Sequence, residues 1–225
     1  MSPIAMERII SLLVRALVLF TAFPVHESAH GLAAYWLGDD TAKKQGRISL
    51  NPAKHINLFG ALFMLFAGVG AAEPVPIDCR KFKNRKIGMA LSNLAGPASN
   101  LILAYLSVLI YRIASFVFII TDTVGTAADI ILYIFSYGAM LNIGLAVFNL
   151  LPVPPLDGSR IVTMFLPEKK YFGIMKYERY VFAVFFVIML SGILDMPLAF
   201  IKDKAMDIMI FLTNWIDNIL ILFIN

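Results

Sequence analysis

The chain has 225 residues, of which 60% are hydrophobic and 15% are charged, with a formal net charge of +4 at pH 7. Because soluble domains average about 45–50% apolar and about 25% charged residues, this composition excludes a water-soluble fold and a disordered chain. The single cysteine, Cys79, also excludes an intramolecular disulfide framework. The sequence therefore predicts an all-α polytopic membrane protein with four to six membrane helices of about 20 residues each.

Apolar segments of membrane-spanning length follow one another along the chain. They lie at about 9–37, 94–120, 127–151, 180–200 and 205–224. The last one contains two Asp and two Asn residues, so it is either a fifth span with a polar face or a helix at the membrane surface. A shorter apolar run at 58–72 fits a re-entrant or interfacial element better than a span. Residues 1–225 are expected to form a single domain.

Lys and Arg residues are distributed unevenly between the segments that connect these spans. They gather at 38–57, 73–86 and 158–179, whereas the loop at 121–126 has none. Since cytoplasmic loops collect Lys and Arg, the three basic segments are expected in the cytoplasm and the N-terminus outside. The net charge of +4 is then an orientation signal, and no nucleic-acid partner is predicted. The expected location is the cell (plasma or inner) membrane, which the chain crosses several times.

The segment His26-Glu27-Ser28-Ala29-His30 has the pattern H-E-x-x-H and lies inside the first predicted span. Residues four apart share a helix face, so both imidazoles can bind one zinc ion while Glu27 sits beside them and holds a water. Ionisable groups inside a membrane helix are costly and are usually functional. The alternative is a polar path through a metal-dependent membrane transporter or channel, which would show inverted repeats; we detect none in this sequence.

Two histidines leave a tetrahedral zinc site incomplete, so a third protein ligand is required. Asp157 follows a helix predicted to end near Leu151 on the cytoplasmic side, which brings its carboxylate to the depth of the histidines. Asp157-Gly158 after several prolines is also a good turn signal, and on that pattern alone both interpretations stand. His55 in the polar loop favours a solvated or loop-ordering role, and Cys79 is expected to be an incidental thiol.

These motifs resemble the site-two protease family of intramembrane zinc metalloproteases, specifically its compact prokaryotic branch. The resemblance extends over nearly the whole chain up to about residue 200 and rests on segments 23–31, 37–47, 51–55, 96–100 and 149–158. It implies one Zn²⁺ per chain held by His26, His30 and Asp157. It also implies that Glu27 activates the bound water.

The resemblance further implies a substrate and an activity. The substrate would be a transmembrane protein in the lipid bilayer, cut in or near its membrane segment by regulated intramembrane proteolysis, with the active site near the cytoplasmic side. The complete ligand set together with Glu27 argues against an inactive relative that binds membrane proteins without cutting them. No oligomeric state is predicted.

Substrate-binding residues follow from the same resemblance. It assigns Asn149, Asn100 and Pro155 to substrate binding, although a helix-end cap for Asn149 and helix packing for Gly96 with Asn100 remain open. The stretch 45–50 is predicted to form a short strand that receives the substrate as an added strand. Glu73 stands where related chains often have a basic residue.

Overall fold

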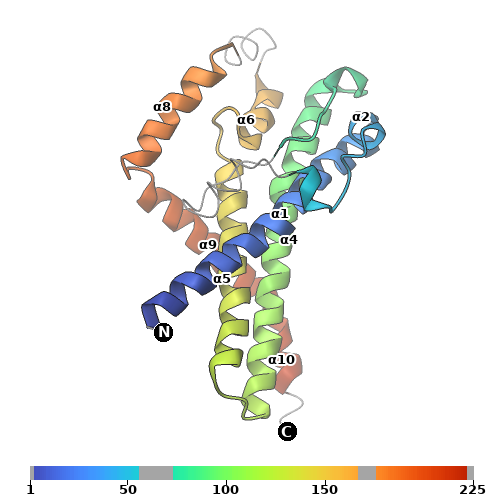
Figure 1. Ribbon diagram of the computed structural model, residues 1–225. Coiled ribbons are helices and arrows are strands. Elements are labelled where there is room, and N and C mark those ends of the chain that lie inside the picture. Colours follow the sequence, from blue (N-terminus) through green and yellow to red (C-terminus); the bar gives the residue numbers. More distant parts are fainter. Residues whose placement is uncertain (1–2, 56–72, 167–175, 222–225) are drawn as a thin grey trace.

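The computed structural model of the protein describes residues 3–55, 73–166 and 176–221 (Figure 1). Within these ranges the chain forms helices joined by turns and has no strand, which confirms the predicted all-α fold. The longer helices are α1 (Pro3–Trp36), α4 (Arg85–Ile120), α5 (Thr126–Asn149), α8 (Glu178–Leu190) and α9 (Asp195–Thr213). The short elements are α2 (Thr41–Lys44), η1 (Pro52–Lys54), η2 (Cys79–Lys81), α6 (Asp157–Val162), η3 (Thr163–Phe165) and α10 (Trp215–Ile221).

Three of the described helices are long and apolar enough to cross a membrane. They are α4, α5 and the part of α1 from Arg8 to Trp36. A fourth crossing is formed if the bent pair Glu178–Leu190 and Asp195–Leu220 counts as one span; its two parts meet at 87°. The chain is therefore a multi-pass membrane protein, and its described residues supply three or four spans, compared with the four to six predicted for the whole chain.

The continuous helix predicted over 180–200 is wrong. α8 ends at Leu190 and α9 begins at Asp195, and between them Gly192 has a φ of +75°, a left-handed conformation that commonly ends helices. With 13 residues, α8 extends only about 20 Å, which is less than the roughly 30 Å of a bilayer core. The segment predicted at 205–224 is divided between the second half of α9 and α10, and residues 222–224 lie outside the described ranges.

Two further elements were predicted, a strand at 45–50 and a re-entrant or interfacial element at 58–72, and the structure tests only the first. Residues 45–50 form no strand, so that prediction is wrong. The physical reason is that the Ser28 hydroxyl takes both backbone groups of Ser49: Oγ donates to the Ser49 carbonyl at 2.7 Å and accepts from its N–H at 3.1 Å. The re-entrant or interfacial element predicted at 58–72 lies outside the described residues.

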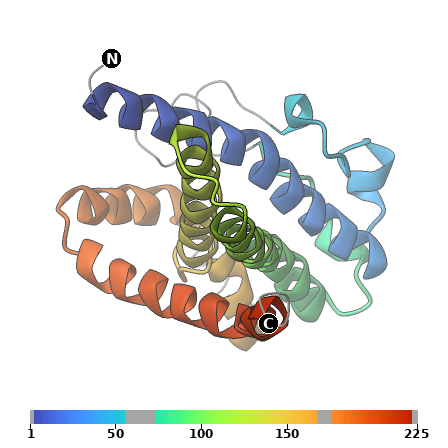
Figure 2. The same cartoon turned by 90° about the horizontal axis from the view of Figure 1, so that it is seen from below.

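Helix α4 lies at the centre of the molecule. It packs against α1, α5, α6, α9 and α10. Seen along α4 and α5, α1 covers one side of this pair and α9 the other (Figure 2). Ala104 of α4 and Ala139 of α5 are fully buried, and such small side chains let membrane helices approach closely. Residues at different heights of α4 can therefore meet α1 and α10.

Candidate metal centre

Helix α1 presents the H-E-x-x-H residues to the interior. His26, Glu27 and His30 are only 6%, 8% and 6% exposed. The two imidazoles share one face of the helix, as predicted, with ring centroids 4.6 Å apart and Nε2 atoms 3.0 Å apart. The motif therefore brings two ring nitrogens to a common point inside the helix bundle.

Asp157 reaches the same point from a distant part of the chain. Its Oδ2 lies 3.2 Å from Nε2 of His26 and 3.4 Å from Nε2 of His30. Asp157 is the first residue of α6, and the chain before it folds back over the end of α5. The turn is so tight that a Cβ at Gly158 would lie 2.1 Å from the carbonyl oxygen of Leu150. The chain turns just before Asp157 rather than at Asp157-Gly158, which are helical, and this turn brings the Asp157 carboxylate to the histidines.

The three ligand atoms fit a zinc ion. In a tetrahedral site with bonds of about 2.0–2.1 Å, neighbouring ligand atoms are about 3.3 Å apart, which is close to the 3.0–3.4 Å found between these three residues. Nδ1 of His30 lies 2.7 Å from the Ser92 carbonyl, which can only accept, so Nδ1 carries the proton and Nε2 presents a lone pair. Nδ1 of His26 is buried without a hydrogen-bond partner in the described part of the chain. Two imidazoles and a carboxylate are a typical donor set for zinc.

Gly96 of α4 makes room for the histidine pair. A Cβ at this position would lie 2.3 Å from Nε2 of His30 and 2.7 Å from Cε1 of His26. No side chain fits there, so the backbone of α4 closes one side of the centre. Gly96 also matches the packing role predicted for it, but sequence reasoning missed that the packing partner is the metal-binding pair itself. A glycine one helical turn before Asn100 in an apolar span was the available signal.

Glu27 is held by a backbone group that the sequence did not point to. The N–H of Val75 donates to Glu27 Oε2 at 2.8 Å, and both residues are buried. Val75 belongs to the segment 73–78 that precedes η2 and α4, 48 positions further along the chain than Glu27. The carboxylate next to His26 therefore has one oxygen fixed by the chain.

The residues predicted to bind substrate do not join the cluster. Asn100 is 1% exposed, and neither its Oδ1 nor its Nδ2 has a hydrogen-bond partner within residues 3–55, 73–166 and 176–221. Asn149 is the last residue of α5, and its Nδ2 donates to the Leu145 carbonyl of the same helix at 3.0 Å. Pro155 is exposed in the turn before α6. Their roles toward a substrate remain predictions.

The two other metal-type side chains lie apart from the centre. His55 is fully buried, so the solvated alternative is wrong, and its Nε2 orders the loop by lying 2.7 Å from the Ser49 carbonyl. Cys79 is a free, half-buried cysteine in η2.

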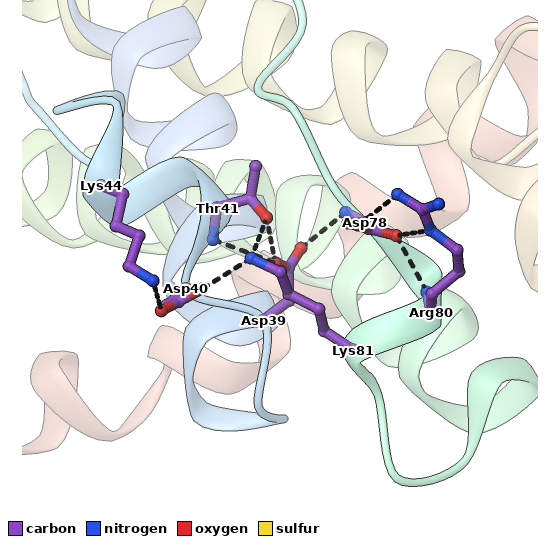
Figure 3. Close-up of polar contacts among 7 residues, drawn as sticks. All are labelled: Asp39, Asp40, Thr41, Lys44, Asp78, Arg80 and Lys81. Atoms are coloured by element: carbon purple, nitrogen blue, oxygen red, sulfur yellow. Dashed lines mark hydrogen bonds and ion pairs between the residues drawn. The ribbon is translucent and has the colours of Figure 1, made fainter.

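A polar cluster connects the end of α1 to the segment that follows Val75 (Figure 3). The buried Asp39 accepts hydrogen bonds from the N–H of Thr41 at 2.9 Å and from the N–H of Asp78 at 2.7 Å. Lys81 pairs with Asp40 at 2.6 Å. Hydrogen bonds from Lys44 and Lys81 lower the pKa of Asp40 to about 2.

Asp78 is paired on the same surface. Its carboxylate accepts from Nε of Arg80 at 2.9 Å and from Nη2 at 2.8 Å. These hydrogen bonds lower the pKa of Asp78 to about 2. The Asp40 and Asp78 carboxylates are therefore charged at neutral pH and hold the surface cations beside the segment.

Comparison with known proteins identifies the family. The profile of Peptidase family M50 matches residues 14–192, which include both the H-E-x-x-H segment and Asp157. The chain is 41% identical to "Putative zinc metalloprotease YwhC" of Bacillus subtilis (strain 168) over 176 residues, which cover 78% of this chain and 79% of that protein. It is also 41% identical to "Putative zinc metalloprotease slr1821" of Synechocystis sp. over 19% of this chain and 14% of that protein.

These matches decide between the classes considered. No solved structure matches the chain significantly. A family of peptidases and a relative named as a zinc metalloprotease give no support to the transporter or channel alternative. The resemblance to the site-two proteases is confirmed, and the expected cofactor, Zn²⁺, agrees with the group formed by His26, His30 and Asp157. The chain belongs to peptidase family M50, the site-two protease family, and is a membrane-embedded zinc metalloprotease.

Proposed function

We propose that the protein is an intramembrane endopeptidase that hydrolyses a peptide bond in or near the transmembrane segment of a membrane protein. The observation that carries the proposal is the convergence of His26, His30 and Asp157 inside a membrane-spanning helix bundle. His30 lies six residues before the end of α1 at Trp36, or about 9 Å along the helix, so the group lies within the span and close to its end. A substrate bond must reach that depth to be cut.

Three side chains have the role of metal ligands in this proposal. His26 and His30 supply neutral imidazole nitrogens, and Asp157 supplies one carboxylate oxygen. The Ser92 carbonyl fixes the tautomer and the ring plane of His30. When bound, zinc lowers the pKa of a ligated water to about 7 and polarises the scissile carbonyl.

Glu27 has the role of general base. Its carboxylate accepts a proton from the attacking water and returns it to the nitrogen of the leaving amine. Because Val75 engages Oε2, we assign the proton transfer to Oε1. Burial in the bundle keeps bulk water away from this exchange.

The active site is proposed to lie near the cytoplasmic face. The C-terminal end of α1 leads into residues 38–55, and α4 starts at Arg85 within the second basic segment. Both basic segments lie at the end of the bundle that carries the metal centre, and Lys and Arg favour the cytoplasmic side. Substrates are therefore expected to carry helix-destabilising residues near the cytoplasmic end of their membrane segment.

A comparison of membrane proteomes tests this function even when no substrate has been identified. Cells that produce the wild type and cells that produce Glu27→Gln are labelled at protein N-termini, and new N-termini within or beside membrane segments are counted. We expect a set of such termini that requires wild-type Glu27. Identical sets from both strains would contradict the proposal, provided that both variants are present in equal amounts and contain zinc.

A further inference from the structure

Residues 73–78, which we name the strap, cross the turn of α1 that carries Glu27. We propose that the strap positions Glu27 through the amide of Val75, and that Arg47 and Asp39 are positioning residues that hold its two ends. This inference rests on the role proposed above for Glu27. It adds a set of residues, outside the metal centre, on which the rate of the reaction depends.

The middle of the strap has one amide that can reach the carboxylate. Val75 lies between Pro74 and Pro76, which have no N–H, and the proline that follows restricts Val75 to an extended conformation. Its N–H donates to Glu27 Oε2 at 2.8 Å in a buried environment. A hydrogen bond to an ionised carboxylate is roughly twice as strong as one between neutral groups. The contact therefore restricts the rotation of the Glu27 side chain.

Arg47 holds the first end of the strap. Its Nη2 donates to the carbonyls of Glu73 at 2.9 Å and Pro74 at 3.3 Å, and its Nη1 lies 3.2 Å from Glu73 Oε1. The Arg47 side chain is 17% exposed, whereas that of Glu73 is 56% exposed. Two of the three contacts go to backbone oxygens, so the guanidinium fixes the path of the strap more than it pairs a surface charge. The N–H of Glu73 also donates to the His55 carbonyl at 2.7 Å.

Asp39 holds the second end. Its buried carboxylate accepts from the N–H of Asp78, the last residue of the strap, as Figure 3 shows. Asp39 is itself tied to α1, because its N–H donates to the Ala34 carbonyl at 2.9 Å. The strap is therefore fixed relative to α1, the helix on which Glu27 lies, at one end by Asp39 and at the other by Arg47.

Gly31 lets the strap approach α1 closely. It lies one helical turn after Glu27, and a Cβ there would be 3.2 Å from Cγ1 of Val75 and 3.1 Å from Cγ1 of Ile48. The Val75 side chain therefore lies against the bare backbone of α1, which keeps its amide within reach of Glu27. Since a misplacement of about 1 Å in a catalytic group can cost about 100-fold in rate, these contacts bear on kcat.

Hydrogen exchange tests, without any substrate, whether Arg47 holds the strap in place. Full-length, zinc-loaded protein is exchanged into D₂O in detergent micelles and then digested. Because the first two positions of a fragment lose their label and residues 74 and 76 are prolines, a fragment that starts at residue 73 and ends at residue 77 reports only the amides of Val75 and Ile77. We expect exchange of Val75 to be about tenfold or more faster in Arg47→Ala than in the wild type. The matched control is Lys54→Ala, which removes an exposed cation from the same loop, and it should leave exchange unchanged. Equal exchange rates in Arg47→Ala and the wild type would overturn the claim that Arg47 holds the strap.

Steady-state kinetics test the consequence for Glu27. The probe is a single-span synthetic peptide with an Asn-Pro pair near its cytoplasmic end and a fluorophore and quencher at its ends, reconstituted with the protein in vesicles. Val75→Pro removes the amide and Val75→Ala keeps it. We expect kcat to be about 10-fold to 100-fold lower for Val75→Pro than for Val75→Ala, with KM and zinc content unchanged.

The outcomes separate this inference from the proposed function. Equal kcat values for the two Val75 variants, while Glu27→Gln is inactive, would overturn the positioning role and leave Glu27 as the base. Cleavage by Glu27→Gln at the wild-type rate would overturn the proposed function and this inference together. If Val75→Pro does not fold, the pair Arg47→Ala and Lys54→Ala makes the same comparison, and only Arg47→Ala should lower kcat. If Arg47→Ala changes KM or zinc content and leaves kcat unchanged, the positioning role is overturned in favour of a structural one.

Discussion

Helix α4 meets two polar clusters, one near each end, and they differ in how their polar atoms are satisfied. In the N-terminal half of α4, Gly96 lies against the histidine pair of the metal centre. Toward the other end, Arg112 pairs with Asp217 of α10, and its Nη2 donates to Asn214 Oδ1 at 2.8 Å and to the Ile210 carbonyl at 3.2 Å. The second cluster is complete in itself, since a cation meets an anion and two further acceptors.

The metal centre is built differently. Two imidazole nitrogens and a carboxylate oxygen converge within 3.4 Å of one another, which is the spacing and the donor set that suit a shared zinc ion. The comparison indicates that the Arg112 cluster fastens helices together, whereas the His26 cluster has the ligand set of a metal site.

The pair Asp157→Ala and Asp217→Ala tests this division most strongly. Both variants remove a carboxylate from a short ion-pairing contact to another helix. The loss of a side chain that supports a metal ligand lowers metal affinity by about 10–100-fold. We expect Asp157→Ala to lower zinc affinity by more than this, because it removes a proposed direct ligand. Asp217→Ala should leave zinc affinity unchanged. The measurement is zinc competition against a calibrated chelator, and equal losses in both variants would contradict the division.

Glycine positions on the two neighbouring helices provide the next test. Gly96→Ala places a Cβ 2.3 Å from His30 Nε2, so the histidines must move and zinc affinity should fall by about 10–100-fold. Gly138→Ala on α5 meets nothing nearer than Ser107 Oγ at 4.0 Å among the described residues and should be tolerated. Chelator competition and thermal unfolding of both variants check this. A Gly96→Ala protein that binds zinc as the wild type does would show that the close approach has no functional role.

Removal of the Arg112 cluster should affect stability alone. We expect Arg112→Leu to lower the free energy of unfolding by about 0.6–1.7 kcal/mol, the range for interhelical hydrogen bonds in membranes. Zinc content and cleavage rate should not change, since the metal-ligand group contains no residue of α10 as far as the structure describes it. Denaturant titration in detergent measures the first quantity and metal analysis the second. Loss of zinc in this variant would mean that the two clusters are coupled.

The smallest effect is expected at the surface cluster beside the strap. The pKa of Asp78 is about 2 in the folded protein, below its ordinary value of about 4 in an unfolded chain. A depressed carboxyl pKa stabilises the folded state above pH of about 4, and this contribution is lost as the pH falls toward 2. We expect Asp78→Asn to flatten the dependence of the unfolding midpoint on pH between 4 and 2, compared with the wild type. Parallel curves for the two proteins would contradict this assignment.

The ligands that lie close together in the chain, His26 and His30, could be predicted from the sequence alone. The distant ligand Asp157 could be predicted only because the membrane topology limited where it can lie. The spacing of His26 and His30 fixes a shared helix face whatever the tertiary packing is. Asp157 could be placed because charge bias puts the end of its helix on the same side of the membrane. Gly96 and Val75 were missed at the site because their contacts depend on how α4 and the strap pack against α1. The spacing of Gly96 and Asn100 marks a close-packing position, but it does not identify the helix that packs there, and no pattern points to the Val75 amide.

Two errors have local causes that override a correct average pattern. The stretch 45–50 has strand-like alternation, but Ser28 takes the backbone groups of Ser49 that a partner strand would need. The apolar run at 180–200 favours one helix by hydropathy, but the left-handed Gly192 ends it. In both cases one residue, Ser28 or Gly192, prevents the structure that the composition of the segment favours.

X-ray absorption at the zinc edge tests the central claim most directly, on purified wild type, Glu27→Gln and His30→Ala. We predict one zinc per chain in the wild type, with two imidazole nitrogens and carboxylate oxygen among its nearest neighbours. The Glu27→Gln spectrum should be identical although cleavage is lost, and His30→Ala should lose one imidazole shell or the metal altogether. A wild-type protein that binds no zinc, or a His30→Ala spectrum identical to that of the wild type, would contradict the account.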